Sequence, residues 1–277
     1  MSAPSALART FGAFRRERRP GLITYVTAGD PDLEGSAAIL RALDRAGADV
    51  LEVGVPFSDP MADGPVIQRA TERALAGGTT LTRVLELVER IRPQIAAPVV
   101  LFSYANPVFR LGVHAFARRA RAAGVDGVLL LDLPIEEAGE AHDALAANGL
   151  DTIFLLSPTT TTERIRRAAA LGRGFLYGIS RLGVTGARDS ISSDARALVE
   201  RIRAETDLPV ALGFGISRPE HVVEVGRWAD AAVVGSALVS VIAEHGRRDT
   251  LEPAVEGFVR WLKGAAPMPA PAMGRPA

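Results

Sequence analysis

The sequence predicts an α/β protein, a (β/α)8 TIM barrel with an extra N-terminal helix and additional helices in its loops. Short segments that are apolar on both faces alternate with amphipathic segments of helical period, and eight of the apolar segments can be counted. This pattern is typical of a parallel sheet covered by helices, and eight units favour closure into a barrel. The length of 277 residues suits one such barrel.

An open, doubly wound sheet is the alternative fold. That fold usually carries a G-x-G-x-x-G motif directly after its first strand. Here the first strand is followed by Gly29-Asp30-Pro31, which is a strong turn but not that motif. The barrel is therefore the fold that we expect.

The predicted strands are rich in β-branched and aromatic residues, and turn residues follow most of them. The first strand stops at the turn just described, and the second stops at Pro56. The eight expected strands cover residues 22–28, 50–55, 98–103, 127–131, 151–156, 174–179, 209–214 and 231–235.

The predicted helices carry apolar residues at spacings of three and four, and several end at glycine. The segment from Leu33 to Ala46 is an example, with Gly47 as its C-cap. A short basic helix over residues 10–19 is expected to precede the barrel. The other expected helices cover residues 64–76, 81–95, 108–123, 135–147, 162–171, 193–205, 218–226, 238–242 and 251–262.

Residues 1–264 are expected to form a single catalytic domain, followed by a flexible, Pro- and Ala-rich tail over residues 265–277. The 32 basic and 32 acidic residues cancel, so the charge does not indicate nucleic acid or an acidic membrane surface as a partner. No apolar run reaches the ~20 residues of a membrane span, and no signal-peptide core is present near the start. A cytoplasmic protein is the default expectation.

Disulfides and thiolate metal sites are excluded because the chain has no cysteine. The four histidines are scattered without a spacing that suits a metal, so no metal site is expected.

Two carboxylates near the second strand are the candidate catalytic residues. Glu52 lies inside that strand between Leu51 and Val53, and a charge in a buried strand is costly unless it is paired or used. Asp63 lies in the loop that follows. Because different surroundings give two acids different pKa values, such a pair suits general acid-base catalysis. The alternative is that the two carboxylates have no catalytic role and belong to a solvated strand end and an acidic turn.

Glycine-rich segments follow the last three strands, and we expect them to bind phosphate. They include Gly186 after strand six, Gly215 after strand seven, and Gly235 with Ser236 after strand eight. Barrels often hold a phosphate between the last loops, at the N-terminus of a short helix. Each glycine taken alone could instead belong to an ordinary turn that joins a strand to a helix. The stretch around Thr185 has glycine at both ends, which suggests a lid over bound ligand.

The three tyrosines of the chain, Tyr25, Tyr104 and Tyr177, all fall on or just after predicted strands. Each one alone could be a packing residue whose hydroxyl finds a neighbour. Together, around one barrel mouth, they would suit a flat aromatic substrate or polar contacts to catalytic acids. Tyr177 is the best candidate for a contact with a catalytic group.

Residues 51–65, LEVGVPFSDPMADGP, resemble the signature of the tryptophan synthase alpha chain family. Further blocks resemble the same family in the same order and span residues 10–263. They are TAGDP at 27–31, YANP at 104–107, GVTG at 183–186, GFGIS at 213–217 and GS at 235–236.

The resemblance implies the retro-aldol cleavage of indole-3-glycerol phosphate to indole and glyceraldehyde 3-phosphate. It gives Glu52 the role of acid-base shuttle, and Asp63 that of acceptor for the indole N–H. Tyr25 stands where the family often has phenylalanine. The substrate-binding residues that the resemblance implies are Tyr25, Phe102, Leu131, Tyr177, Thr185, Gly186, Phe214, Gly215, Gly235 and Ser236.

A beta chain that uses pyridoxal phosphate is the partner that the resemblance implies, in an alpha2-beta2 tetramer that passes indole between subunits. The segment from Pro56 to Pro60, including Asp59, and Asn106-Pro107 would face it. No cofactor is expected in this chain, whose only lysine is Lys263.

Three rival functions stay open from the sequence. They are a stand-alone lyase that releases indole, a different phosphosugar enzyme such as an isomerase, and a barrel kept only as an allosteric subunit. The presence of both Glu52 and Asp63 argues against the last two.

Overall fold

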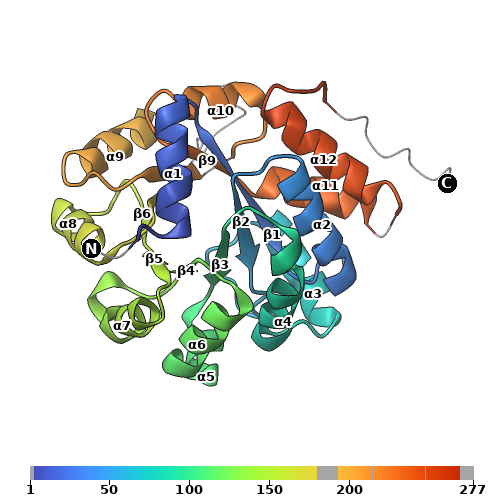
Figure 1. Ribbon diagram of the computed structural model, residues 1–277, viewed down its shortest axis with the longest axis horizontal. Helices are drawn as coiled ribbons and strands as arrows, with labels where there is room; N and C mark the ends of the chain where they lie inside the picture. The colour runs from blue at the N-terminus through green and yellow to red at the C-terminus, as the bar shows by residue number, and fades with distance from the viewer. Residues whose placement is uncertain (1–2, 180–192, 214, 247, 269–277) are drawn as a thin grey trace.

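The computed structural model describes residues 3–179, 193–213, 215–246 and 248–268. Over these residues parallel strands form one sheet that curls into a barrel inside a layer of helices (Figure 1). The strands are Gly21–Thr27 (β1), Val50–Gly54 (β2), Val99–Ser103 (β3), Gly127–Leu130 (β4), Asp151–Ile153 (β5), Leu155–Leu156 (β6), Leu176–Ile179 (β7), Val210–Gly213 (β8) and Ala231–Val234 (β9).

Closure of the barrel depends on the strand that was predicted over residues 151–156. It is divided at Phe154 into β5, which pairs with β4, and β6, which pairs with β7. The carbonyl of Phe154 accepts a hydrogen bond from the Tyr177 amide at 3.0 Å, so the ladder to β7 continues through the division. The sheet order β5-β4-β3-β2-β1-β9-β8-β7-β6 is therefore a ring of eight strand positions, and the predicted fold is confirmed.

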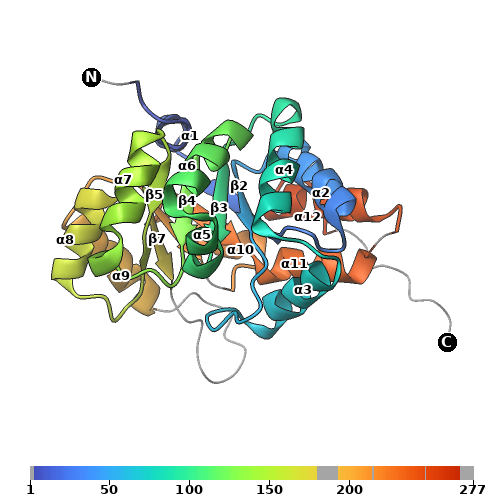
Figure 2. The same ribbon diagram turned by 90° about the horizontal axis from the view of Figure 1, so that it is seen from below.

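The helices cover the outside of the ring (Figures 1 and 2). They are Ala6–Glu17 (α1), Leu33–Arg45 (α2), Pro65–Ala76 (α3), Leu81–Ile91 (α4), Ala105–Leu111 (α5), Val113–Ala123 (α6), Gly139–Ala147 (α7), Thr162–Leu171 (α8), Ser193–Arg203 (α9), Pro219–Val225 (α10), Ser236–His245 (α11) and Leu251–Leu262 (α12), with short 3-10 turns at Arg92–Gln94 (η1) and Ile135–Glu137 (η2).

Several predicted helix boundaries were wrong. The helix predicted over residues 108–123 is two helices, because Gly112 adopts a φ of +87° that breaks the helical backbone. The helix predicted over 135–147 begins with the turn η2, and the one predicted over 238–242 extends from Ser236 to His245. The basic N-terminal helix starts earlier than predicted, at Ala6, because Ser5 accepts a hydrogen bond from the Ala8 amide.

The extra helix α1 closes the amino end of the barrel. Its buried side chains Leu7, Phe11 and Phe14 join the cluster of residues that fill the barrel interior. Phe11 stacks on Phe175 with the ring centroids 5.0 Å apart. In Figure 2, α1 lies at the opposite end of the molecule from α3, which follows the loop after β2.

Carboxylates strengthen the same amino end. Asp49, which precedes β2, accepts a hydrogen bond from the Leu22 amide of β1 at 2.8 Å and pairs with Arg19. Two further aspartates before strands accept from the first amide of a neighbouring strand and pair with arginine in the same way. These are Asp126 with Val99 and Arg92, and Asp230 with Val210 and Arg15.

We predict that Phe11→Ala lowers the free energy of unfolding by about 3 to 5 kcal/mol, because the change opens a cavity where α1 meets the barrel interior. Phe109→Ala is the control, since Phe109 is 52% exposed, and it should change that free energy little. Urea unfolding followed by circular dichroism measures both. A loss of unfolding free energy in Phe11→Ala as small as that in Phe109→Ala would show that α1 does not stabilise the barrel.

Candidate active site

Strand register places Glu52 inside the barrel. Glu52 pairs with Tyr25 of β1 on one side and with Val100 of β3 on the other. Because alternate residues of a strand face the same side, its neighbours Leu51 and Val53 face the helices while Glu52 faces the interior. The side chain is 1% exposed, and neither carboxyl oxygen has a hydrogen-bond partner among the described residues.

Burial raises the pKa of Glu52 to about 8, because the apolar wall disfavours the charged carboxylate. At neutral pH the group is therefore mostly a neutral carboxylic acid that can donate its proton. A pKa close to the working pH also lets the same group take a proton back, which is the requirement for a general acid-base shuttle.

Asp63 stands in the loop between β2 and α3 and is held from two sides. The Tyr104 hydroxyl donates to Asp63 Oδ2 at 3.3 Å and accepts from the Ala62 amide at 3.1 Å. The Gln68 side chain donates to the Asp63 carbonyl at 3.0 Å. Partial burial raises the pKa of Asp63 to about 6, and the Tyr104 hydrogen bond opposes that rise. Asp63 is thus mostly ionised at neutral pH.

Aromatic rings line the interior beside Glu52. Tyr25 is buried and meets Phe102 edge to face, with ring centroids 5.4 Å apart. Burial raises the pKa of the Tyr25 phenol, and the charges of Asp63 and Glu52 contribute. Leu131 and Phe102 are partly buried at the edge of the interior cluster, as walls of an open pocket would be.

Tyr177 is buried in the same interior, and no hydrogen bond joins it to Glu52. A contact between Tyr177 and Glu52 therefore stays a prediction. Burial raises the pKa of the Tyr177 phenol, and the Glu52 charge is the second cause of that rise. Glycines make room for both interior tyrosine hydroxyls. A Cβ on Gly54 would lie 2.3 Å from Tyr25 Oη, and one on Gly213 would lie 2.4 Å from Tyr177 Oη.

A pocket of about 240 Å³ lies where the loops after β8 and β9 meet the start of α11. Gly215 has a φ of +64°, and Gly235 precedes the first turn of α11. The lining has no lysine or arginine among the described residues, so an anion there would be held by backbone N–H groups and hydroxyls. It consists of Gly215, Ile216, Ser217, Gly235, Ser236, Ala237 and Ser240.

Three predicted site residues lie outside the described residues. They are Thr185, Gly186 and Phe214. The predicted lid around Thr185 lies there as well.

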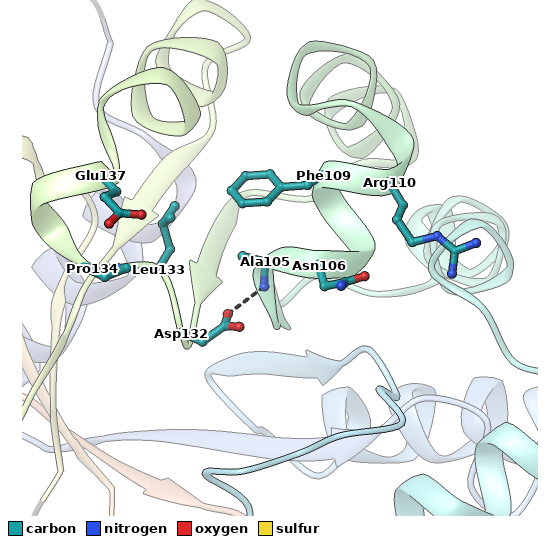
Figure 3. A pocket seen from close by; sticks show the side chains of 8 residues that line it. All are labelled: Ala105, Asn106, Phe109, Arg110, Asp132, Leu133, Pro134 and Glu137. Atoms are coloured by element: carbon teal, nitrogen blue, oxygen red, sulfur yellow. Dashed lines mark hydrogen bonds between the residues drawn. The ribbon is translucent and has the colours of Figure 1, made fainter.

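A second pocket, of about 490 Å³, lies between α5 and the segment that joins β4 to α7 (Figure 3). Asp132 Oδ1 accepts a hydrogen bond from the Ala105 amide at 2.7 Å, which ties the two sides together. The residues around this pocket are Ala105, Asn106, Phe109, Arg110, Asp132, Leu133, Pro134 and Glu137. Asn106, one of the residues expected to face a partner, is among them.

The family of the chain follows from comparison with known proteins. A family model described as the tryptophan synthase alpha chain matches residues 11–263. The chain belongs to this family. A relative from Solibacter usitatus is 50% identical over 257 residues, covering 93% of this chain and 96% of the relative. One from Geotalea uraniireducens is 49% identical, covering 94% and 97%. Both are named tryptophan synthase alpha chain.

Solved structures of tryptophan synthases have the same fold. The alpha subunit from Legionella pneumophila has a TM-score of 0.87 and 37% identity, covering 95% of this chain and 98% of its own. Mycobacterium tuberculosis tryptophan synthase gives 0.86 and 40%, covering 95% and 99%. The Pyrococcus furiosus structure, described as an a2b2 complex, gives 0.84 and 41%, covering 88% and 98%.

Sequence reasoning missed how Asp63 is held. Tyr104 alone was interpreted as a packing residue, and a polar contact to a catalytic acid was expected first of Tyr177, yet it is the Tyr104 hydroxyl that joins Asp63 to the loop backbone. Its place after a strand, at the same end as Asp63, was the available signal. Within the described residues no group of histidine and acidic side chains could hold a metal ion. In the same part of the chain no helix is long and apolar enough to span a bilayer.

We predict that Glu52→Gln removes a pH dependence of stability. Between pH about 4.5 and 8 the folded protein keeps a proton on Glu52 that the unfolded chain has lost, so the free energy of unfolding falls as pH rises through this window. The loss in the parent should be a few kcal/mol, on the order expected for a shift of several pKa units. Unfolding titrations at pH 5 and pH 8 measure it.

The control variant is Asp59→Asn, whose parent carboxyl is exposed, and it should keep the pH dependence of the parent. Asp63 contributes in the same direction at lower pH, up to about 6, and remains in both variants. An identical pH slope in the parent and Glu52→Gln would contradict the buried, neutral state of Glu52.

Proposed function

We propose that the chain catalyses the alpha reaction of tryptophan synthase, the cleavage of indole-3-glycerol phosphate, with Glu52 and Asp63 as the catalytic residues. The observation that carries this is the difference between the two acids. One carboxyl is buried with a pKa of about 8, and the other is held on the adjacent loop with a pKa of about 6. At neutral pH one is a neutral acid that can donate a proton and the other a carboxylate that can stabilise positive charge, as the reaction requires.

Neutral Glu52 donates its proton to C3 of the indole ring. Positive charge then develops on the ring N–H, where the Asp63 carboxylate accepts a hydrogen bond and stabilises it. Glu52, now ionised, takes the proton of the side-chain hydroxyl. The bond between indole C3 and the side chain breaks, its electron pair returns to the ring, and the former alcohol becomes an aldehyde. Glu52 ends protonated, so the cycle balances.

Substrate binding in this proposal uses the two features beside the acids. The indole ring would lie against Tyr25, Phe102 and Leu131, with Tyr177 as a further wall. Phe214 remains a proposed contact from the sequence alone. The phosphate would be held in the 240 Å³ pocket by the backbone of Gly215, Gly235 and Ser236. Thr185 and Gly186 remain proposed ligand contacts from the sequence.

No cofactor is needed by this chemistry, because both proton transfers use side chains of the chain. Pyridoxal phosphate would belong only to the beta chain. Lys263, the only lysine in the sequence, donates to the Gly47 carbonyl at 2.5 Å and lies 3.5 Å from Asp49 at the amino end of the barrel. A cytoplasmic location, the single domain over residues 1–264 and the flexible tail over 265–277 stay predictions.

The partner surface proposed for a beta chain lies around the 490 Å³ pocket and the neighbouring loop. Phe109 is 52% exposed at the pocket, and Met61 is 91% exposed on the loop that carries Asp63. Large apolar side chains at such exposure are typical of an interface. Asp59 is exposed on the same loop and suits a partner contact rather than chemistry. An α2β2 assembly, as in the Pyrococcus furiosus complex, is the expected form.

We predict that Glu52→Gln and Asp63→Asn each lower indole production by at least 100-fold, because the first loses the proton-transfer group and the second loses the carboxylate that stabilises the positive charge at the ring N–H. A coupled assay for glyceraldehyde 3-phosphate measures the rate, and binding of inorganic phosphate checks that the pocket is intact. Asp59→Asn is the matched control and should keep the parent rate. Full activity of Glu52→Gln would support a different phosphosugar enzyme, a rival that family membership argues against.

We predict that an added beta chain stimulates cleavage by the parent and that Phe109→Arg abolishes the stimulation. The variant places a charge in the proposed apolar interface, whereas cleavage by the chain alone should stay near the parent rate. Indole production with and without the beta chain is the measurement. High turnover of the parent alone, without stimulation, would instead indicate a stand-alone lyase.

A further inference from the structure

His221 is a buried histidine directly behind the phosphate pocket. It lies in α10, is 6% exposed, and its Nδ1 accepts a hydrogen bond from the Ser217 amide at 3.3 Å. Ser217 is the last residue of the loop that lines the pocket after β8. The ring therefore reaches back from the helix onto the anion-binding loop.

We propose that His221 is a positioning residue for phosphate binding, which holds the Ser217 end of this loop in the shape that lines the pocket. The proposal rests on the proposed function, because it takes the pocket to be the site of the substrate phosphate. It assigns His221 no contact with substrate. Its role is to fix loop shape through one hydrogen bond.

Loop shape decides affinity here because the described lining offers no cationic side chain. Backbone N–H groups and hydroxyls hold an anion only when they point to one place. At the other end of the loop, Gly215 has a φ of +64° and, as glycine, little intrinsic preference for one conformation. A hydrogen bond at Ser217 reduces the number of conformations that the loop can adopt.

The hydrogen bond defines the state of the ring. Nδ1 can accept only when it carries no proton, so the Ser217 contact requires the tautomer with the ring proton on Nε2. Nε2 lies 3.4 Å from the Arg218 guanidinium, at the start of α10, and because that group can only donate, it packs beside a protonated Nε2 without a hydrogen bond to it. The ring is thus packed between the Ser217 amide and the Arg218 side chain, and an asparagine oxygen could replace Nδ1 as the acceptor.

His245 is a matched control in the same chain. It is also 6% exposed, and its Nδ1 lies 2.9 Å from Thr250 Oγ1 near the end of α11. Neither residue lines the phosphate pocket. Replacing His245 by leucine therefore removes a buried histidine of equal exposure without touching the loop at Ser217.

The test compares His221→Leu, His221→Asn and His245→Leu with the parent. Steady-state cleavage of indole-3-glycerol phosphate gives KM and kcat, and calorimetric titration gives the Kd of inorganic phosphate. His221→Leu should raise KM and the phosphate Kd together by about tenfold, the size expected for one lost hydrogen bond, with kcat within about twofold of the parent. His221→Asn should recover most of both values, and His245→Leu should leave them unchanged.

The proposal is overturned if His221→Leu leaves KM and the phosphate Kd at the parent values, if His221→Asn is as impaired as His221→Leu, or if His245→Leu has the same effect. A fall in kcat at constant KM also overturns it. Should His221→Leu not fold, nitrogen NMR of the parent decides: an unprotonated Nδ1 and a slowly exchanging Ser217 amide support the proposal, and a protonated Nδ1 overturns it.

These results separate the two proposals. A parent that binds phosphate in a His221-dependent way but does not cleave the substrate supports the role of His221 and refutes the proposed function. A parent that cleaves the substrate equally well with leucine at position 221 refutes only the role of His221. A parent that binds no inorganic phosphate refutes the role of His221 whatever its activity.

Discussion

A carboxyl group buried without a hydrogen-bond partner is the constraint on which the site depends. Glu52 is surrounded by the apolar barrel interior, and neither oxygen is satisfied within the described structure. Ionisation at that place is costly, so the group stays protonated to unusually high pH. Any nearby cation or amide donor would stabilise the carboxylate and lower its pKa. Because the described residues offer it no such partner, this side chain is an acid at neutral pH.

The free-energy cost of burying Glu52 must be offset by stabilising interactions elsewhere in the molecule. Many of these interactions lie at the amino end of the barrel. There α1 buries Leu7, Phe11 and Phe14, and aspartates pair with strand amides and arginines. The carboxyl end has glycine-rich loops instead. One ion pair stabilises a helix at the carboxyl end. Arg73 of α3 donates two hydrogen bonds of 2.7 and 2.8 Å to the buried Asp30, and this pair fixes the helix that follows the Asp63 loop. The tightly packed amino end and the glycine-rich loops thus lie at opposite ends of the barrel.

The fold could be predicted from sequence because its strands are apolar on both faces and glycine or proline marks many of their ends. Boundaries were less predictable. Gly112 breaks one predicted helix through its backbone conformation, and Phe154 divides one predicted strand, and neither effect has a periodic signature. The barrel interior position of Glu52 was predictable from its apolar neighbours.

The sequence indicates which residues lie at the same end of the barrel, but not which of them form hydrogen bonds once the loops have folded. The bridge from Tyr104 to Asp63 depends on how the loop after β2 folds over the next strand. The bond from His221 to Ser217 depends on a side chain that turns back over the start of its own helix. Both residues looked ordinary in the sequence, a tyrosine after a strand and a histidine on a helix, because the partner in each case is fixed only by tertiary structure.

The fit between each interior tyrosine and the glycine opposite it links positions that are distant in the chain. A methyl group at residue 54 or 213 would overlap a phenol oxygen, so neither glycine can be exchanged while its tyrosine remains. Phenylalanine at position 25 would not relieve the overlap, because ring atoms at the places of Tyr25 Cζ and Cε2 would still lie 2.7 and 2.8 Å from a Cβ at position 54. A side chain at position 54 therefore requires a residue smaller than phenylalanine at position 25 or a shift of that ring, so the two positions on neighbouring strands can change only as a pair.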